Sequence, residues 1–335
     1  MIAVIGAGAM GGALTVQLVR AGNEVTILAT PYDGPFVSAH LNAEPHPALG
    51  VPLPDEVSIV EPDSWRDVLG QADILVLAVA TAGLVSTVQQ AAPHTREDCL
   101  WAIATKGWDE ETLRPAAQVV ADELGSHDRV VAIVGPSLAA EIAHGVPTAV
   151  VCASTSAASA RRVAERFGSD RFRTYTSTDV AGVEVGAIMK NVVAIAAGMC
   201  DGLADEFGVE AMTNAKAFVF ARGLVEMSRM ARAMGGRPET ILGLTGAGDL
   251  FVTVLGGRNG RFGRLLGAGR TPQQALDEMN TTVEGYMNAR AAVVLADKLG
   301  LDLQVVDTVA KVVHYGMSPK EAIERLVAGS VEEEL

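Results

Sequence analysis

A lysine and an asparagine in the middle of an otherwise apolar stretch are the residues best placed to do chemistry in this sequence. The stretch Glu184–Ile195 reads EVGAIMKNVVAI, with Lys190 followed by Asn191. Burial in apolar surroundings favours the neutral amine and moves the pKa of a lysine toward the working range of a general acid. Such a group can give a proton to a carbonyl oxygen during reduction. A structural ion pair, for example with Glu184, accounts for the pattern equally well.

A glycine motif at the start of the chain predicts the source of the reducing equivalents. Residues 6–11 read GAGAMG and stand between an apolar run, Ile2–Ile5, and an amphipathic helix. In such a motif Gly6 permits a tight turn, Gly8 lets a pyrophosphate approach, and Gly11 lets helix and strand pack closely. The helix N-terminus adds free amides and a partial positive charge. We therefore predict a dinucleotide site whose contacts include Gly6, Gly8, Ala9, Met10 and Gly11.

The choice between NAD and NADP stays open at this stage. The residue that ends the second strand reads the ribose: Asp or Glu favours NAD, and an Arg nearby favours NADP. After the predicted strand Glu24–Leu28, this chain has Ala29-Thr30-Pro31-Tyr32-Asp33. Thr30 can bond either a hydroxyl or a phosphate, and Asp33 lies a few residues late, where a turn cap is an alternative role for it. The predicted cofactor is NAD or NADP.

Two further segments follow predicted strands and are expected at the same edge of the sheet. Lys106 comes directly after the strand Leu100–Ala104, and Gly135-Pro136-Ser137 comes directly after Val130–Val134. Ligands of open α/β sheets collect at the carboxyl ends of the strands. We expect Lys106 on the cofactor side, where it can hold the charge of a phosphorylated substrate, and the second segment to close over the nicotinamide.

A glycine-rich region in the second half predicts an anion site. The run GAGDL at residues 246–250 contains Asp249, and it is followed by Thr253 and by Arg258-Asn259 between glycines. Glycine-rich turns expose backbone amides, and an arginine fork binds phosphate through two hydrogen bonds. An arginine on an exposed loop is the commoner arrangement, and the sequence does not decide between the two.

Composition excludes several other classes of protein. The 335 residues carry 26 basic and 40 acidic side chains, a formal net charge of −14, which opposes binding to nucleic acid or anionic membranes. The six histidines show no metal-binding spacing, and the three cysteines form no C-x-x-C pair. We expect no metal site and no disulfide framework.

The start of the chain and its longest apolar segment bear on localisation. The N-terminal MIAVIGAGAM lacks a basic region and suits a strand and turn rather than a signal peptide. The longest apolar segment, Val183–Met199, is interrupted by Lys190 and Asn191. We expect a cytoplasmic protein without stable membrane insertion.

The order of apolar patterns predicts the fold. Short apolar runs alternate with helical patterns in the first half, which is typical of an α/β fold with a Rossmann-type, doubly wound parallel sheet. Residues 31–62 are polar and proline-rich, and we expect them to be irregular. After about Asp179 only helical patterns follow. We predict a dinucleotide-binding domain over residues 1–178 and an all-helical domain over residues 179–335.

Taken together, these motifs resemble the NAD(P)-dependent glycerol-3-phosphate dehydrogenase family over nearly the whole chain. The matching segments are residues 6–11, Thr105–Gly107, Gly135–Ser137 with Glu141, Gly145–Thr148, Gly182–Glu184, Lys190–Val192, Asn214–Ala217, Arg222–Leu224 with Glu226-Met227, Gly246–Leu250, Arg258-Asn259 and Val283–Gly285. Their number and order make the resemblance specific.

The resemblance implies a role for each matching residue. Lys190 takes the place of the catalytic lysine, the general acid/base, and Lys106 and Asp249 are assigned to the same catalytic group. Contacts to the substrate, with Arg258-Asn259 as the phosphate-binding pair, are expected from Lys106, Gly135, Ser137, Asn191, Asp249, Thr253, Arg258 and Asn259. Contacts to the cofactor outside the glycine motif are expected from Thr30, Lys106, Ala139, Arg258 and Glu284.

The activity that the resemblance implies is hydride transfer between nicotinamide and the pair glycerol 3-phosphate/dihydroxyacetone phosphate, which supplies glycerol phosphate for phospholipid synthesis. A homodimer is also implied. The chain departs from typical bacterial members, which have a basic residue where Thr30 stands and a serine where Gly257 stands, and residues 32–54 match poorly. The alternatives are a dehydrogenase of another small polyol or ketose phosphate and a non-catalytic NAD(P)-binding sensor.

Overall fold

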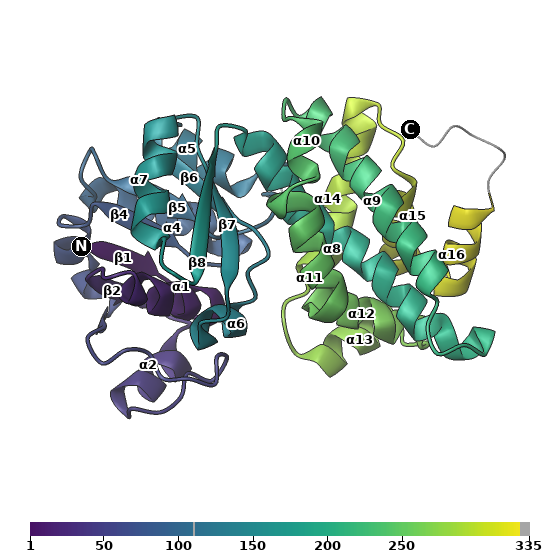
Figure 1. The fold of residues 1–335 in the computed structure, drawn as a ribbon, viewed down its shortest axis with the longest axis horizontal. Coiled ribbons are helices and arrows are strands. Elements are labelled where there is room, and N and C mark those ends of the chain that lie inside the picture. Colours follow the sequence, from purple (N-terminus) through teal and green to yellow (C-terminus); the bar gives the residue numbers. More distant parts are fainter. Residues whose placement is uncertain (110, 329–335) are drawn as a thin grey trace. The chain divides into compact units, whose positions relative to one another are not determined.

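The structure is a computed structural model that describes residues 1–109 and 111–328. Its contacts divide the chain into two compact units, the first over Met1–Asp109 and Arg114–Val180 and the second over the short segment before Arg114 and the chain from Ala181 onward. Residues 329–335, the end of the predicted helical domain, lie outside the described residues. Figure 1 shows the strands in the first unit and the long helices in the second.

The first unit is built on one sheet of eight strands in the order β3-β2-β1-β4-β5-β6-β7-β8. The strands are β1 Ile2–Ile5, β2 Val25–Leu28, β3 Ser58–Val60, β4 Ile74–Leu77, β5 Leu100–Ile103, β6 Val130–Val134, β7 Thr148–Ala153 and β8 Phe172–Ser177. β1, β2, β4, β5 and β6 are buried along their whole length, as the continuous apolar runs predicted.

The helices of the first unit fall into two groups, as a doubly wound sheet requires. α1 packs against α6 and α7, whereas α4 packs against α3 and α5. Their bounds are α1 Ala9–Arg20, α2 Gly34–Leu41, α3 Trp65–Leu69, α4 Leu84–Ala91, α5 Ala116–Leu124, α6 Ala139–His144 and α7 Ala157–Phe167. The Rossmann-type α/β arrangement predicted from the sequence is confirmed.

Three details of the sheet differ from the prediction. Residues 31–62 are not wholly irregular, because they contain α2 and the short strand β3, which extends the sheet by pairing with β2. β7 runs antiparallel to β6. β8 was not predicted, because only Phe172 is buried in this strand and its other side chains lack an apolar alternation. Pairing with β7 over six residues holds the strand in place.

The second unit is helical throughout its described residues. Its helices are α8 Val180–Leu203, α9 Thr213–Ala233, α10 Pro238–Ile241, α11 Asp249–Gly256, α12 Arg258–Gly267, α13 Pro272–Met279, α14 Glu284–Leu299, α15 Gln304–Tyr315 and α16 Pro319–Val327. The predicted glycine turn at residues 246–250 is in fact the end of a π-helical turn, Leu244–Gly248, followed at once by α11. Arg258 and Asn259 likewise lie in the first turn of α12 and not in a loop.

Two segments have the length and hydropathy of a membrane span. The first, Val180–Phe207, has this length and hydropathy although it contains Lys190 and Asn191, and 89% of its most apolar stretch is buried inside the protein. The second, Pro238–Gly256, is divided between α10, the π-helical turn and α11. The burial of α8 explains its composition, because a helix that is apolar on all sides can form the core of a protein unit.

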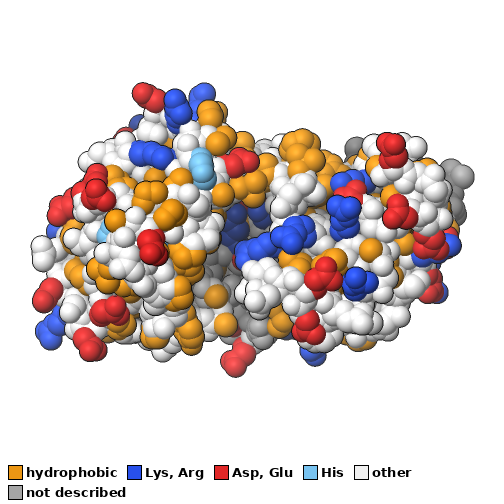
Figure 2. All heavy atoms as spheres, turned by 90° about the horizontal axis from the view of Figure 1, so that it is seen from below, with side chains coloured by type: hydrophobic (Ala, Val, Ile, Leu, Met, Phe, Trp, Pro, Cys, Tyr) orange, Lys and Arg blue, Asp and Glu red, His pale blue; other side chains and the backbone are white. Residues whose placement is uncertain are grey.

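Acidic side chains do not form one patch on the face of the molecule that Figure 2 shows. Figure 2 shows one face, on which they stand as separate groups among polar and apolar neighbours. In the sequence, the 40 acidic residues occur in both halves of the chain, which has a formal net charge of −14. Dispersed like charges favour solubility without creating one strong local field.

A buried glutamate links two helices of the second unit. Glu226 of α9 is 2% exposed, and its carboxylate accepts hydrogen bonds from the backbone N–H groups of Val305 at 2.7 Å and Val306 at 3.1 Å, in the first turn of α15. These bonds cap amides that α15 cannot satisfy internally. Burial nevertheless raises the pKa of Glu226 from 4.5 to about 7.

The raised pKa predicts a pH dependence of stability. Between pH 4.5 and about 7 the folded state binds more protons at Glu226 than the unfolded state, so stability should fall as pH rises through this window. Glu226→Gln should remove up to about 3 kcal/mol of that fall in the free energy of unfolding. Urea unfolding followed by circular dichroism from pH 5 to pH 8 measures it, with the exposed Glu239→Gln as control. Parallel curves for the wild type and Glu226→Gln would contradict the assignment.

The burial of the three cysteines predicts that none of their thiols reacts while the protein is folded. Cys99, Cys152 and Cys200 are each 0% exposed, and burial raises the pKa of each thiol to about 12. Because the thiolate is the reactive form, none should react with a thiol-specific disulfide reagent while the protein is folded. In denaturant all three should be titrated. Rapid modification of a thiol in the folded protein would contradict the prediction and show that the surrounding segment opens readily.

Candidate active site

The glycine loop adopts the tight conformation that its sequence predicted. Gly6 follows β1 with φ of +98°, and a Cβ there would lie 2.8 Å from the carbonyl oxygen of Ala78. A side chain at Gly11 would collide with the carbonyl of Gly6. The amide of Gly6 donates to Leu28 O at 3.1 Å, which ties the turn to the end of β2. Glycine is therefore required here by the close packing of the turn, the helix and the neighbouring strand.

The start of α1 suits the pyrophosphate of a dinucleotide. Its N-cap, Gly8, provides no side-chain cap, its first turn holds no acidic residue, and a Cβ on Gly8 would meet nothing within 4 Å. The first-turn amides, including those of Ala9 and Met10, have no partner inside the helix because they precede its first i→i−4 bond. Free amides and the positive end of the helix dipole together favour a bound anion.

A buried histidine, His46, supports this loop. His46 is 1% exposed, and its Nε2 lies 2.8 Å from the carbonyl oxygen of Ala7. The amide of Ala48 donates to Nδ1 at 3.2 Å, so Nε2 is the nitrogen that carries the hydrogen and donates to Ala7. The ring also stacks on Phe36 of α2 at 4.7 Å. Residues 31–62, which were predicted to be irregular, thus support the glycine motif through His46.

Lys106 and its neighbours are held between adjacent strand ends. Thr105 Oγ1 donates to Val79 O at 2.7 Å, and Thr81 Oγ1 donates to Lys106 O at 3.2 Å. β4 and β5 are parallel neighbours, so both loops lie at the carboxyl edge of the sheet. The predicted position of Lys106 at the cofactor edge agrees with this placement.

The segment after β6 is fixed to the glycine-motif helix. Ser137 Oγ donates to Gly135 O at 2.8 Å, and Ala139 begins α6. Arg20, at the end of α1, donates to the last carbonyls of α6, Ile142 O at 2.9 Å and Ala143 O at 2.6 Å. A cation at the C-terminus of a helix is favourable. The arginine therefore connects the helix that begins at the glycine motif with the helix that follows Ser137.

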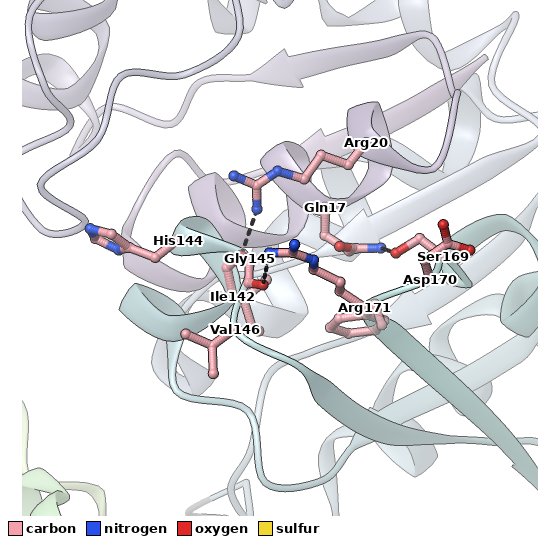
Figure 3. Close-up of a pocket in the computed structure, with 10 residues that line it drawn as sticks. Gln17, Arg20, Ile142, His144, Gly145, Val146, Ser169, Asp170 and Arg171 are labelled. Carbon is pink, nitrogen blue, oxygen red and sulfur yellow. Dashed lines mark hydrogen bonds between the residues drawn. The ribbon is translucent and has the colours of Figure 1, made fainter.

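This arginine also lines a cavity of about 330 Å³ at the C-terminal end of α1. Figure 3 shows Arg20 of α1 with Gln17 and with Arg171, near the chain turn at Gly145. Gln17 is itself bonded to Phe167 O at 2.8 Å and to Ser169 Oγ at 3.0 Å. The cavity lies at the opposite end of α1 from the glycine motif, and its polar groups serve mainly to join α1 to neighbouring elements.

In the second unit, Lys190 forms a buried ion pair. Its Nζ lies 2.5 Å from Asp249 Oδ1, and the side chains are 7% and 2% exposed. The partner foreseen from the sequence, Glu184, is on the same helix, whereas Asp249 is the first residue of α11. Thr253 Oγ1 donates to Asp249 O at 2.6 Å and is buried with the pair. A buried charge of either sign is costly unless paired, so the two residues hold each other in place.

A glycine makes this approach possible. Gly186 stands one turn before Lys190 in α8, and a Cβ on it would lie 2.5 Å from the carbonyl oxygen of Thr245 in the π-helical turn. Any side chain there would push the turn away from α8. Because Asp249 follows the turn directly, the position of the carboxylate depends on this contact.

The remaining predicted residues of the second unit form a connected network beside Lys190. Asn259 Nδ2 donates to Asn191 Oδ1 at 2.9 Å, and Asn191 Nδ2 donates to Glu284 Oε2 at 3.1 Å. Asn259 Oδ1 accepts from the amide of Gly285 at 2.8 Å. Arg258 Nη2 lies 3.7 Å from Glu284 Oε1, and the arginine side chain is 52% exposed. The network joins α8, α12 and the start of α14.

The predicted residues are divided between the two units, and hydrogen bonds or ion pairs connect those of the second. The first unit holds the glycine motif, Thr30, Lys106 and the Gly135–Ala139 segment; the second holds the lysine pair and the asparagine network. Among the described residues, no group of three or more histidine, cysteine or acidic side chains is arranged to hold a metal ion.

Both halves of the chain match known protein families. Residues 1–160 match the N-terminal family "NAD-dependent glycerol-3-phosphate dehydrogenase N-terminus", and residues 179–324 match its C-terminal counterpart. A glycerol-3-phosphate dehydrogenase [NAD(P)+] of Symbiobacterium thermophilum is 39% identical over 98% of this chain and 93% of its own length. An NADP(+)-dependent glycerol-3-phosphate dehydrogenase of Archaeoglobus fulgidus is 34% identical over 96% of this chain and 98% of its own.

A solved structure extends the likeness to three dimensions. Glycerol-3-phosphate dehydrogenase of Coxiella burnetii superimposes with a TM-score of 0.87 at 31% identity, covering 98% of each chain. Family matches over both halves, relatives above 30% identity over nearly the full length and a shared fold lead to one conclusion. The chain belongs to the NAD-dependent glycerol-3-phosphate dehydrogenase family.

Proposed function

We propose that this chain is an NAD(P)-dependent sn-glycerol-3-phosphate dehydrogenase that interconverts glycerol 3-phosphate and dihydroxyacetone phosphate. The observation that carries the proposal is the buried side chain of Lys190, which lies on the largely apolar helix α8 and is paired with Asp249 of α11. The names of the relatives from Symbiobacterium and Archaeoglobus support the substrate pair. In the cell the product would supply glycerol phosphate for phospholipid synthesis.

The bound nicotinamide supplies or accepts the hydride. During reduction, Lys190 Nζ gives a proton to the carbonyl oxygen of the substrate, and during oxidation it takes the proton back from the hydroxyl. Asp249 fixes the direction of the amine and balances its charge. The apolar surroundings of α8 exclude water, which strengthens the interaction of the ammonium with negative charge developing on oxygen.

Phosphate recognition is assigned to the first turn of α12. Arg258 is half exposed and 3.7 Å from its acidic neighbour, so its guanidinium fork can turn to a phosphate. α12 has no acidic residue in its first turn, and its N-cap is Gly257. Free amides at that terminus add to the attraction. Asn259, which is bonded on both sides, fixes the backbone from which Arg258 projects.

The remaining assignments complete the proposal. Residues 1–178 bind the cofactor and residues 179–335 carry the catalytic lysine. The substrate's oxygens are bound by Lys106, Gly135, Ser137, Asn191, Asp249 and Thr253, and the cofactor contacts include Thr30, Lys106, Ala139, Arg258 and Glu284. We further propose that the enzyme is a cytoplasmic homodimer without stable membrane insertion.

Removing the proton donor tests the central assignment. Lys190→Met should lower kcat for dihydroxyacetone phosphate by about 10³-fold, within the range for loss of a general acid, while cofactor binding persists. Oxidation of NADH and NADPH at 340 nm gives the rate, and calorimetry gives the binding. Lys311→Met removes an exposed, ion-paired lysine of the same unit and is the control.

A second substitution separates chemistry from folding. Lys190→Met leaves Asp249 buried without its partner and can therefore reduce stability. Lys190→Arg keeps the positive charge beside Asp249, but a guanidinium does not release its proton near neutral pH. It should therefore be folded and nearly inactive. Substantial turnover by Lys190→Arg would refute the assignment, and no turnover by the wild type with either cofactor would favour a sensor.

Removing the arginine proposed to bind the phosphate should affect KM far more than kcat. Arg258→Ala should raise KM for dihydroxyacetone phosphate by about 10- to 100-fold, which corresponds to losing one charged hydrogen-bonded contact. The matched control is Arg261→Ala, an exposed arginine of the same helix. Steady-state kinetics with dihydroxyacetone phosphate and unphosphorylated dihydroxyacetone separate the effects. An equal loss with both substrates would argue against phosphate recognition by Arg258.

A further inference from the structure

The turn after β2 carries a buried carboxylate at the place where Rossmann proteins read the adenosine ribose. Asp33 is 5% exposed, and its Oδ2 accepts hydrogen bonds from the backbone N–H of Thr30 at 2.7 Å and from Thr30 Oγ1 at 2.8 Å. The side chain therefore returns toward the strand end although Asp33 lies late in the sequence. Oδ1 takes no part in these two bonds, and a carboxylate can accept further donors.

The same turn lies next to the glycine motif. The amide of Gly6 donates to Leu28 O at 3.1 Å, which places the end of β2 beside the glycine turn. The amide of Ala29 donates to Val60 O at 2.9 Å, so the end of β3 and the exposed Glu61 that follows it are also adjacent. A dinucleotide whose pyrophosphate rests on α1 would therefore extend its adenosine ribose toward a corner with acidic side chains.

The chain segment that forms this corner lacks basic side chains. No lysine or arginine occurs between Arg20 and Arg66, a stretch that contains β2, α2 and β3. Of the acidic residues in the same stretch, Asp33 lies in the turn itself and Glu61 directly follows the neighbouring strand β3. A phosphate on the ribose 2′ position would bring additional negative charge into this region. A 2′-hydroxyl, by contrast, can donate a hydrogen bond to a carboxylate.

From these observations we propose that this chain selects NAD(H) over NADP(H), and that Asp33 is the residue that disfavours the 2′-phosphate. The inference rests on the proposed function and specifies its cofactor. It departs from the relative in Archaeoglobus fulgidus, whose name describes it as NADP(+)-dependent. Thr30 acts as the positioning residue, because its amide and hydroxyl hold the Asp33 carboxylate at the strand end.

Equilibrium binding of the two reduced cofactors tests the proposal without depending on turnover. Isothermal titration calorimetry of the wild type with NADH and NADPH should give a dissociation constant at least about tenfold higher for NADPH. Asp33→Asn keeps an oxygen acceptor for Thr30 but removes the charge. It should lower the dissociation constant of NADPH several-fold and leave that of NADH nearly unchanged or slightly weaker.

The chain offers a matched control and a safeguard. Glu24→Gln removes the same charge from an exposed residue at the opposite end of β2, and it should leave the ratio of the two constants unaltered. If Asp33→Asn disturbs folding, judged by its thermal unfolding midpoint, Glu61→Gln takes its place. That exposed substitution at the end of β3 should shift the ratio in the same direction by a smaller factor.

Each outcome bears on a definite claim. Equal or tighter binding of NADPH by the wild type, or the same ratio in Asp33→Asn as in Glu24→Gln, overturns the inference. Either result leaves the proposed dehydrogenase activity standing, provided that dihydroxyacetone phosphate is reduced with one of the cofactors. Absence of binding by both cofactors overturns the inference together with the cofactor assignment on which it rests.

Discussion

The candidate site of the second unit depends on one buried ion pair, Lys190 with Asp249. Two opposite charges in an apolar interior are tolerated only when they lie in contact, so this pair fixes the distance between α8 and the start of α11. Well-packed hydrophobic residues could join the two helices at least as stably, since a buried salt bridge often contributes little net free energy. The presence of an amine here is therefore better explained by proton transfer than by stability. Asn191 follows Lys190 in α8, so the same helix also positions the hydrogen bonds that join Asn191 to Asn259 and Glu284.

The site of the first unit depends on unpaired backbone amides that can bind an anion. The start of α1 leaves its amides free because Gly8 supplies no cap, and free amides are tolerated only where water or a ligand reaches them. The loop must consequently be held from outside. His46 holds the carbonyl of Ala7, and Arg20 anchors the far end of α1 to α6. A rigid loop loses little conformational entropy when it binds a ligand.

The sequence revealed those features that depend on local pattern and missed those that depend on pairing. The buried strands and the glycine motif were predictable because continuous apolar runs and G-x-G-x-x-G express local requirements. Lys190 was conspicuous because it interrupts an apolar helix. Its partner could not be identified, because Asp249 reaches it through a π-helical turn whose approach depends on Gly186. β8 was missed since its stability comes from pairing with β7, and His46 since its role is set by a distant carbonyl.

The acidity of the chain does not prevent it from binding anions, because electrostatic interactions in salt are local. At physiological ionic strength, exposed charges separated by more than roughly 8 Å interact weakly, so a net charge of −14 spread over the surface creates little field at a given helix terminus. Nearby donors decide the outcome instead. The first turns of α1 and α12 contain no acidic residue, and α12 adds Arg258. The turn after β2 instead holds a negative charge, the buried carboxylate of Asp33, which accepts a hydrogen bond from Thr30 Oγ1. Under the proposed cofactor preference, the start of α1 attracts the pyrophosphate, whereas the carboxylate of Asp33 disfavours a further phosphate a short distance away.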